Sequence, residues 1–192
     1  SVQAVKIFCG VALLLITMGQ CYSWANNTAL ESRVKQKYKD LNGRPGCYFR
    51  ALSVQGLLVE LLADARKSIG LSEDEDLDCN IHELLPVLLD KGRHLKCPKD
   101  GREGTAYVDA VEDTEKVGRA TYMLSYTWLY KLSVIVNTLT EWCDRNRLDR
   151  KKICVWICCV CINQHRVEEE RKLGKVVPFK GFRDEFSMRI IG

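Results

Sequence analysis

Two cysteine–histidine pairs stand at the spacing of metal ligands. The members of each pair are separated by two residues, so both side chains of a pair can reach one ion. Structural zinc takes four nitrogen or sulfur ligands in a tetrahedron. The pattern C-x2-H…H-x2-C therefore predicts a possible zinc site formed by Cys79, His82, His94 and Cys97. The intervening segment has the apolar pattern of a helix, so the alternative is a core thiol beside a surface histidine.

A second chemically suggestive stretch is VWICCVCINQHR at residues 155–166. An apolar run containing three cysteines breaks here into amide, imidazole and guanidinium side chains. Residues 153–162 are apolar at nearly every position, which favours a parallel strand covered on both faces. We interpret this segment as a central strand, and Asn163, Gln164 and His165 as its carboxyl end.

The elements that would position these groups form a strand–helix–strand unit. Residues 122–126 (YMLSY) predict a short strand, and residues 132–143 place apolar side chains on one helical face. Such a βαβ unit joins parallel strands, and ligands of open α/β sheets bind beyond the carboxyl ends of those strands. We therefore expect a rim suited to a polar ligand with a ring or phosphates, lined by Ser125, Tyr126, Trp128, Asn163, Gln164 and His165. The alternative is that Asn163 and Gln164 only start the next helix, with His165 on the surface.

Two of these segments resemble a known family. The stretch WICCVCINQ at 156–164, followed by EEER at 168–171, resembles the central motif of heterokaryon-incompatibility (HET) domains. That motif is roughly W-I-D-x-x-C-I-N-Q with an acidic, Arg-containing helix after it, and Cys158 stands at its Asp position. HET domains are similar to Toll/interleukin-receptor (TIR) domains, whose first strand, F-I-S-Y-S, resembles MLSYT at 123–127.

The resemblance, over about residues 120–192, implies an α/β fold with a partial flavodoxin-like (TIR-like) parallel sheet. It also implies self-association, or binding to other TIR/HET-like domains, in signalling, innate immunity or defence. Many TIR domains cleave NAD with a glutamate on a helix after the third strand. This chain is expected to lack that helix, so we assign no catalytic residue, and NAD is a possible substrate only of a longer form. The alternative is a non-catalytic protein-interaction module.

The region before residue 120 is expected to be small and mostly helical. Helices are predicted over residues 28–41, 50–69 and 81–92, with Pro86 kinking or restarting the last one. Residues 105–111 predict a strand or hairpin arm, and 111–119 a linker. The predicted organisation is thus a leader over 1–27, a helical region over 28–119 and a TIR/HET-like part over 120–192.

The leader allows three interpretations. Its apolar run, residues 7–18, is shorter than the about twenty residues that cross a membrane. A secretory signal would end near residues 23–25, and Asn26 would then be a glycosylation site. Alternatively, residues 18–23 (MGQCYS) fit N-myristoylation of Gly19 with palmitoylation of Cys21 as a second membrane signal. The third interpretation is a buried helix.

Composition narrows the class of protein. The chain has 192 residues, 46% of them hydrophobic and 28% charged, which is typical of a soluble globular domain. A net charge of +4 does not predict the concentrated basic face of a nucleic-acid binder. The ten cysteines are not spaced as a disulfide scaffold and indicate reduced thiols. We therefore expect a cytoplasmic protein, tethered to a membrane surface if it is lipidated, with secretion as the alternative.

Overall fold

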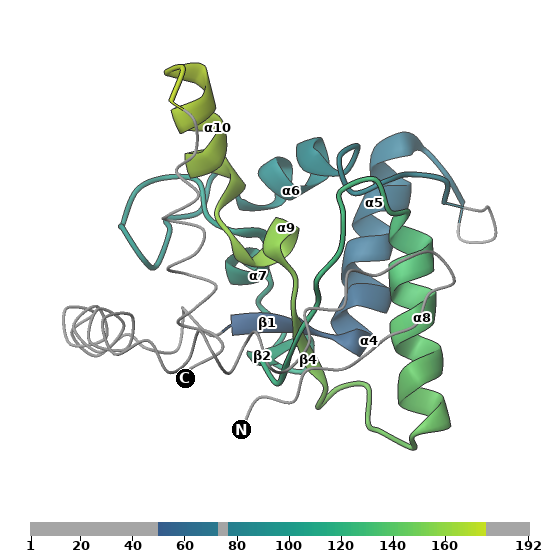
Figure 1. Ribbon diagram of the computed structural model, residues 1–192. Helices are drawn as coiled ribbons and strands as arrows, with labels where there is room; N and C mark the ends of the chain where they lie inside the picture. Colours follow the sequence, from purple (N-terminus) through teal and green to yellow (C-terminus); the bar gives the residue numbers. More distant parts are fainter. Residues whose placement is uncertain (1–49, 73–76, 176–192) are drawn as a thin grey trace, which may run out of the picture.

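The computed structural model describes residues 50–72 and 77–175 (Figure 1). Gly19, Cys21, the glycosylation motif and the predicted helix over 28–41 lie outside the described residues. Within the described ranges, no helix combines the length and apolar character that crossing a bilayer requires.

One four-stranded sheet, in the order β2-β1-β4-β3, organises the described residues. The strands are β1 (Arg50–Ser53), β2 (Val117–Arg119), β3 (Tyr122–Met123) and β4 (Cys154–Trp156). β1 runs antiparallel to both β2 and β4, whereas β3 and β4 are parallel. The chain is therefore α/β as predicted, but its described sheet is mixed rather than parallel. The predicted boundary at residue 120 falls inside this sheet, between β2 and β3.

The predicted βαβ unit is confirmed. Helix α8 (Leu132–Arg145) connects β3 to β4, with Tyr122 opposite Val155 and Met123 opposite Trp156. The second strand is much shorter than predicted, however. After Ile157 the chain turns into the one-turn helix α9 (Cys158–Cys161), most of which is buried. An apolar run indicates that a segment is buried but does not determine its backbone conformation. Here the run is divided between the strand β4 and the helical turn α9.

The helix predicted over residues 50–69 begins four residues late. Arg50–Ser53 is strand β1, and the helical segment then runs through α4 (Val54–Gly56), the wider π-helical turn η1 (Leu57–Leu61) and α5 (Leu62–Ile69). The hydroxyl of Ser53 starts the segment by accepting a hydrogen bond from the Gly56 amide at 2.9 Å. The segment ends at Ile69, the last residue of the predicted range, and Gly70, at φ 72°, caps it.

The helix predicted over 81–92 is present in part, whereas the strand predicted over 105–111 is not formed. Helix α6 (Leu85–Gly92) carries Pro86 in its first turn, so the proline starts the helix rather than kinking it. The predicted strand over 105–111 is wrong, because this segment contains the buried one-turn helix α7 (Tyr107–Ala110). The strand lies instead in the predicted linker, where β2 pairs with β1.

Backbone packing, rather than side-chain pattern, positions β2 on the helical segment. Ser53 N donates to the Lys116 carbonyl at 2.8 Å, which brings that carbonyl against Gly56. A Cβ placed on Gly56 would lie 2.4 Å from the Lys116 oxygen.

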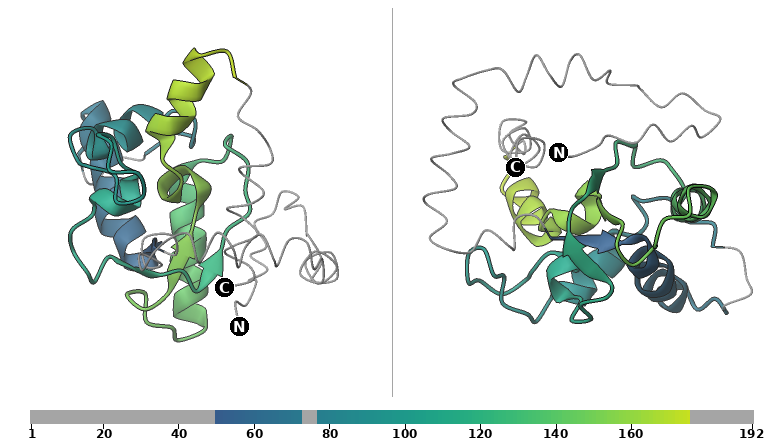
Figure 2. Two further views of the ribbon diagram at one scale, coloured as in Figure 1. Left: turned by 90° about the vertical axis from the view of Figure 1, so that its left-hand side faces the viewer. Right: turned by 90° about the horizontal axis from the view of Figure 1, so that it is seen from below.

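The last helix, α10 (Gln164–Lys172), extends away from the sheet, as Figures 1 and 2 show.

Replacing Gly56 with alanine tests this close approach. In an open helix this change stabilises a protein by roughly 0.5–1 kcal/mol. Here it should reduce the free energy of unfolding by about 1–3 kcal/mol, because backbone atoms must separate. Urea denaturation measures the difference, with Lys67→Ala on the exposed face of α5 as the control. A stabilised Gly56→Ala variant would contradict the contact.

Candidate functional site

A tyrosine and two cysteines meet where β3 and β4 end. The Tyr126 hydroxyl lies 3.2 Å from the Cys158 sulfur and accepts a hydrogen bond from the Cys159 amide at 3.3 Å. We call these three residues the tyrosine–thiol node. Since the Tyr126 oxygen already accepts from Cys159, its own proton is available to the Cys158 sulfur. Tyr126 does meet the segment that follows β4, but its partners are two cysteines that we predicted inside the strand, not the amide side chains predicted at its end.

All three groups of the node are protonated at neutral pH. Burial raises the pKa of Cys158, and the opposing contributions of Tyr126 and Trp128 do not offset it. Burial raises the pKa of Cys159, and also that of Tyr126, beside these thiols. Cys158 is the most accessible cysteine in the part of the chain that the structure describes, because each of the others is buried.

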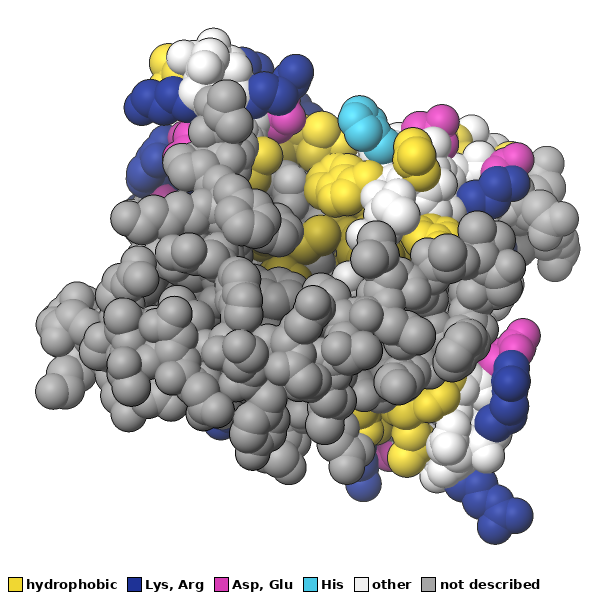
Figure 3. All heavy atoms as spheres, viewed as in Figure 1, with side chains coloured by type: hydrophobic (Ala, Val, Ile, Leu, Met, Phe, Trp, Pro, Cys, Tyr) yellow, Lys and Arg dark blue, Asp and Glu magenta, His cyan; other side chains and the backbone are white. Residues whose placement is uncertain are grey.

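The loop after β3 presents aromatic and apolar groups beside this node. Ser125 is exposed, and the partly buried Trp128 contacts His82 edge-on, with ring centroids 6.1 Å apart. The backbone holds this loop in place, since the His82 amide donates to the Trp128 carbonyl at 3.2 Å. Leu129, at the tip of the turn, is 80% exposed. Figure 3 shows apolar side chains gathered beside an exposed histidine on this face of the molecule.

Asn163 and Gln164 are buried and serve the fold. The Asn163 side chain caps α10 by accepting from the His165 amide at 3.0 Å, and it also donates to the Gly104 carbonyl at 2.9 Å. The Gln164 amide donates to the carbonyls of Cys158 and Ile162, both at 3.3 Å. The structure therefore favours the alternative interpretation, in which these residues start the next helix instead of lining an open rim.

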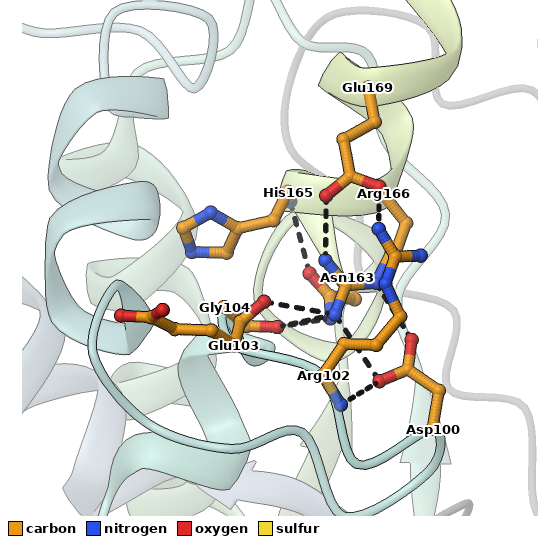
Figure 4. Close-up of polar contacts among 8 residues, drawn as sticks. All are labelled: Asp100, Arg102, Glu103, Gly104, Asn163, His165, Arg166 and Glu169. Carbon is orange, nitrogen blue, oxygen red and sulfur yellow. Dashed lines mark hydrogen bonds and ion pairs between the residues drawn. The ribbon is translucent and has the colours of Figure 1, made fainter.

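Arg166 fastens α10 to the loop before α7, a role that the sequence did not reveal. Its guanidinium contacts Asp100 at 2.7 and 3.2 Å, Glu169 at 2.8 Å, and the Glu103 carbonyl at 3.0 Å (Figure 4). Arg102 forms a second ion pair with Glu169. We call Asp100, Arg102, Arg166 and Glu169 the arginine clamp. The available signal was the arginine that directly follows the CINQH stretch.

The clamp determines the ionisation of its carboxyl groups. The hydrogen bond from Arg166 holds the pKa of Asp100 well below its usual range. A hydrogen bond from Arg102 and the nearby charge of Arg166 lower the pKa of Glu169. Both carboxylates are therefore ionised and paired at neutral pH.

His165 packs beside the clamp instead of lying on the surface. Its ring lies so close to Gly104 that a Cβ there would be 2.9 Å from the imidazole Cγ. Gly104 also has φ 85°, which an L side chain rarely adopts. Burial, with the charge of Arg166, lowers the pKa of His165. The imidazole is thus neutral and holds the loop in position.

The predicted zinc site is not assembled. Among the residues that the structure describes, no group of three or more His, Cys, Asp or Glu side chains could hold a metal ion. Cys79 is buried beside the loop that follows β3, and the exposed His94 instead faces Glu103 at 3.4 Å. The two halves of the motif diverge because residues 79–82 pair with the segment around Tyr130, whereas residues 96 and 103 form a separate β-bridge.

Comparison with known proteins adds no relative. No protein-family model, curated protein or solved structure matches this chain.

The clamp predicts an acid-dependent loss of stability that Arg166→Met should reduce, since the pair between Arg102 and Glu169 remains. Because the folded-state pKa values of Asp100 and Glu169 lie below their unfolded values, the clamp stabilises the protein at neutral pH. That stabilisation decreases as the pH falls below the ordinary carboxyl pKa of about 4. At pH 7, Arg166→Met should cost roughly 1–2 kcal/mol, a range discounted for partial exposure.

Urea denaturation of both proteins between pH 7 and pH 3 measures this effect. The difference between wild type and Arg166→Met should shrink as the solution becomes more acidic. Arg145→Met is the matched control, since Arg145 pairs with Glu141 on the exposed face of α8. An Arg166→Met cost that is the same at both pH values would show that the side chain stabilises through packing and its carbonyl hydrogen bonds, not through the ion pairs.

Proposed function

We propose that this chain is a TIR/HET-like signalling module of the cytoplasm that acts by associating with a second copy or with related domains. The observation that carries the proposal is the contact between Tyr126 and the cysteines Cys158 and Cys159. Tyr126 belongs to the stretch that resembles a TIR first strand, and the cysteines belong to the stretch that resembles the HET motif. Two pieces of one family pattern, separated by about thirty residues, therefore lie together at adjacent strand ends.

The remaining pieces of the pattern have structural roles that support the proposal. In CINQ, the asparagine caps α10 and the glutamine fastens the turn before it. The acidic, arginine-containing helix that follows places Glu169 beside Arg166. These contacts fix the start of α10 against the turn before it and against the Gly104 carbonyl, so the matching residues have a definite structural role.

The sheet is compatible with the first part of a flavodoxin-like arrangement. In that arrangement the first strand lies between the second and the third. If β3 and β4 are the first and second strands, a third strand would add to the other edge of β3. No strand pairs with that edge among residues 50–72 and 77–175. On this proposal β1 and β2 cover the opposite, outer edge of β4.

The described residues favour association over catalysis. Glu169 pairs with two arginines, and Glu168 pairs with Arg171 at 2.8 Å, so both carboxylates are already neutralised by neighbouring arginines. The groups of the tyrosine–thiol node are neutral, and none is poised as a general base. The seven described cysteines are thiols, which fits the reducing compartment that we propose. The beginning of the chain would then contribute the lipid-anchor pattern at Gly19 and Cys21.

Light scattering on the purified full chain over a range of concentrations tests association. We expect the mean mass to rise with concentration. Leu129→Asp should shift this transition at least tenfold upward, because it places a charge on the most exposed apolar side chain beside the node. Leu173→Asp is the matched control, a 70% exposed leucine beyond the end of α10. A chain that stays monomeric throughout would contradict the proposal.

Incubation of the same preparation with NAD separates the two classes of function. We expect chromatography to detect no released nicotinamide, since Glu168 and Glu169 are both paired with arginines. Nicotinamide release that scales with protein concentration would contradict the proposal of a non-catalytic association module and would indicate an NAD-cleaving enzyme.

A further inference from the structure

Two cysteines of the single-turn helix α9 are placed to react with each other. Cys158 is its first residue and Cys161 its last, and the amides of Cys161 and Ile162 bond to the carbonyls of Ile157 and Cys158 at 2.9 and 3.0 Å. These bonds confirm helical geometry, in which residues three apart have Cα atoms about 5 Å from each other. Disulfides usually join Cα atoms roughly 4.4–6.8 Å apart.

We propose that Cys158 and Cys161 form a reversible intrahelical disulfide, which makes this end of the sheet a redox-sensitive site for a peroxide or a disulfide such as oxidised glutathione. The proposal does not depend on the proposed function. It requires the Cβ atoms to approach, since neighbours on a helix face are about 5–6 Å apart at Cβ and disulfides need about 3.5–4.5 Å. Cys158 can make this rotation because α9 is one turn long and the residue before Cys158 is extended.

Geometry and exposure select this pair over the others. Cys158 is partly exposed, so an oxidant meets it first, whereas Cys159 and Cys161 are 1% exposed. Cys159 cannot readily resolve an oxidised Cys158, because adjacent Cα atoms are about 3.8 Å apart, below the usual disulfide range. Cys161 is therefore the partner on the same helical turn.

The reaction balances with a peroxide as the oxidant. The Cys158 thiolate attacks one peroxide oxygen, the O–O bond breaks, and Cys158 becomes a sulfenic acid as water leaves. The Cys161 sulfur then attacks the Cys158 sulfur, an S–S bond forms, and the hydroxyl leaves as a second water. Two thiols are oxidised by two electrons and one peroxide is reduced to two waters. Because burial raises the pKa of Cys158, the first step should accelerate as the pH rises.

The bond would change the tyrosine–thiol node. A Cys158 sulfur drawn toward Cys161 moves away from the Tyr126 hydroxyl, which now lies 3.2 Å from it. Tyr126 would then keep only its bond to the Cys159 amide. The loop that carries Trp128 and Leu129 follows Tyr126 directly, so oxidation would weaken the contact that holds this loop in place.

Mapping thiols in the full chain tests the proposal. The reduced protein is treated with hydrogen peroxide, blocked with iodoacetamide and digested with trypsin. The peptide Ile153–Arg166 carries Cys154, Cys158, Cys159 and Cys161. We expect this peptide to lose two alkylation sites and two hydrogens, with fragmentation placing the bond between Cys158 and Cys161. Dithiothreitol should restore both sites.

Variants supply the control and the contrary outcomes. Cys159→Ser should keep the bond, whereas Cys158→Ser and Cys161→Ser should each abolish it. Sulfinic acid at Cys158 with Cys161 still alkylated, a bond to another cysteine, or unchanged alkylation would each overturn the proposal. The wild-type map alone decides among these outcomes, so the test stands even if a variant fails to fold.

Discussion

The parallel pairing of β3 with β4 is the constraint on which the rest of the site depends. Parallel strands bring their carboxyl ends to the same edge, and here that edge joins a tyrosine to a cysteine more than thirty residues further along the chain. The ladder continues only as far as the bond from the Leu124 amide to the Trp156 carbonyl at 3.0 Å. Beyond it the two chains separate, one into an exposed aromatic loop and the other into a buried helical turn.

The polar residues after α9 suggest a binding site in the sequence, but they are explained by buried backbone groups that need hydrogen-bond partners. A chain that leaves a buried turn carries backbone groups that need hydrogen-bond partners. Asn163 and Gln164 supply them. Arg166 donates to the Glu103 carbonyl and shares the Gly104 carbonyl with Asn163, while it pairs with Asp100. Amides and arginine in this cluster are thus explained by the cost of unpaired buried groups. The groups that remain accessible are the side chains of the loop after β3 and the partly exposed thiol of Cys158.

A second network of charges supports the other side of the molecule. Glu60, on the wide helical turn, contacts Lys91 at 2.6 Å and Lys116 at 2.7 Å, and Asp64 accepts a hydrogen bond from Tyr107 at 2.7 Å. Burial alone would raise the pKa of Glu60, but hydrogen bonds from the two lysines outweigh it and lower the pKa. The network ties the helices α5, α6 and α7 to the segment before β2. Its charges are mutually compensated, so it serves the fold.

The sequence by itself determined the features that depend on local chemistry. Side-chain periodicity located α8 and the end of the helix before Gly70, and the apolar run at 153–162 correctly indicated a mostly buried segment. Pro86 was expected to kink or restart its helix, and it lies in the first turn of α6. The sequence also placed Tyr126 at a strand end that faces β4. These results follow from neighbours within a few residues, which propensity and spacing describe directly.

Tertiary structure alone decided which buried segments became strands and which polar groups remained available. Arg50–Ser53 was predicted as helix but forms a strand between β2 and β4. In the predicted strand over 105–111, residues 107–110 instead form a helical turn, and β2 is the strand that pairs with the outer side of β1. The four predicted zinc ligands lie apart, and the arginine clamp forms, because each of these side chains is positioned by distant parts of the chain. Contacts between residues about sixty positions apart carry no signal in local spacing, because the partners meet only when the whole chain folds.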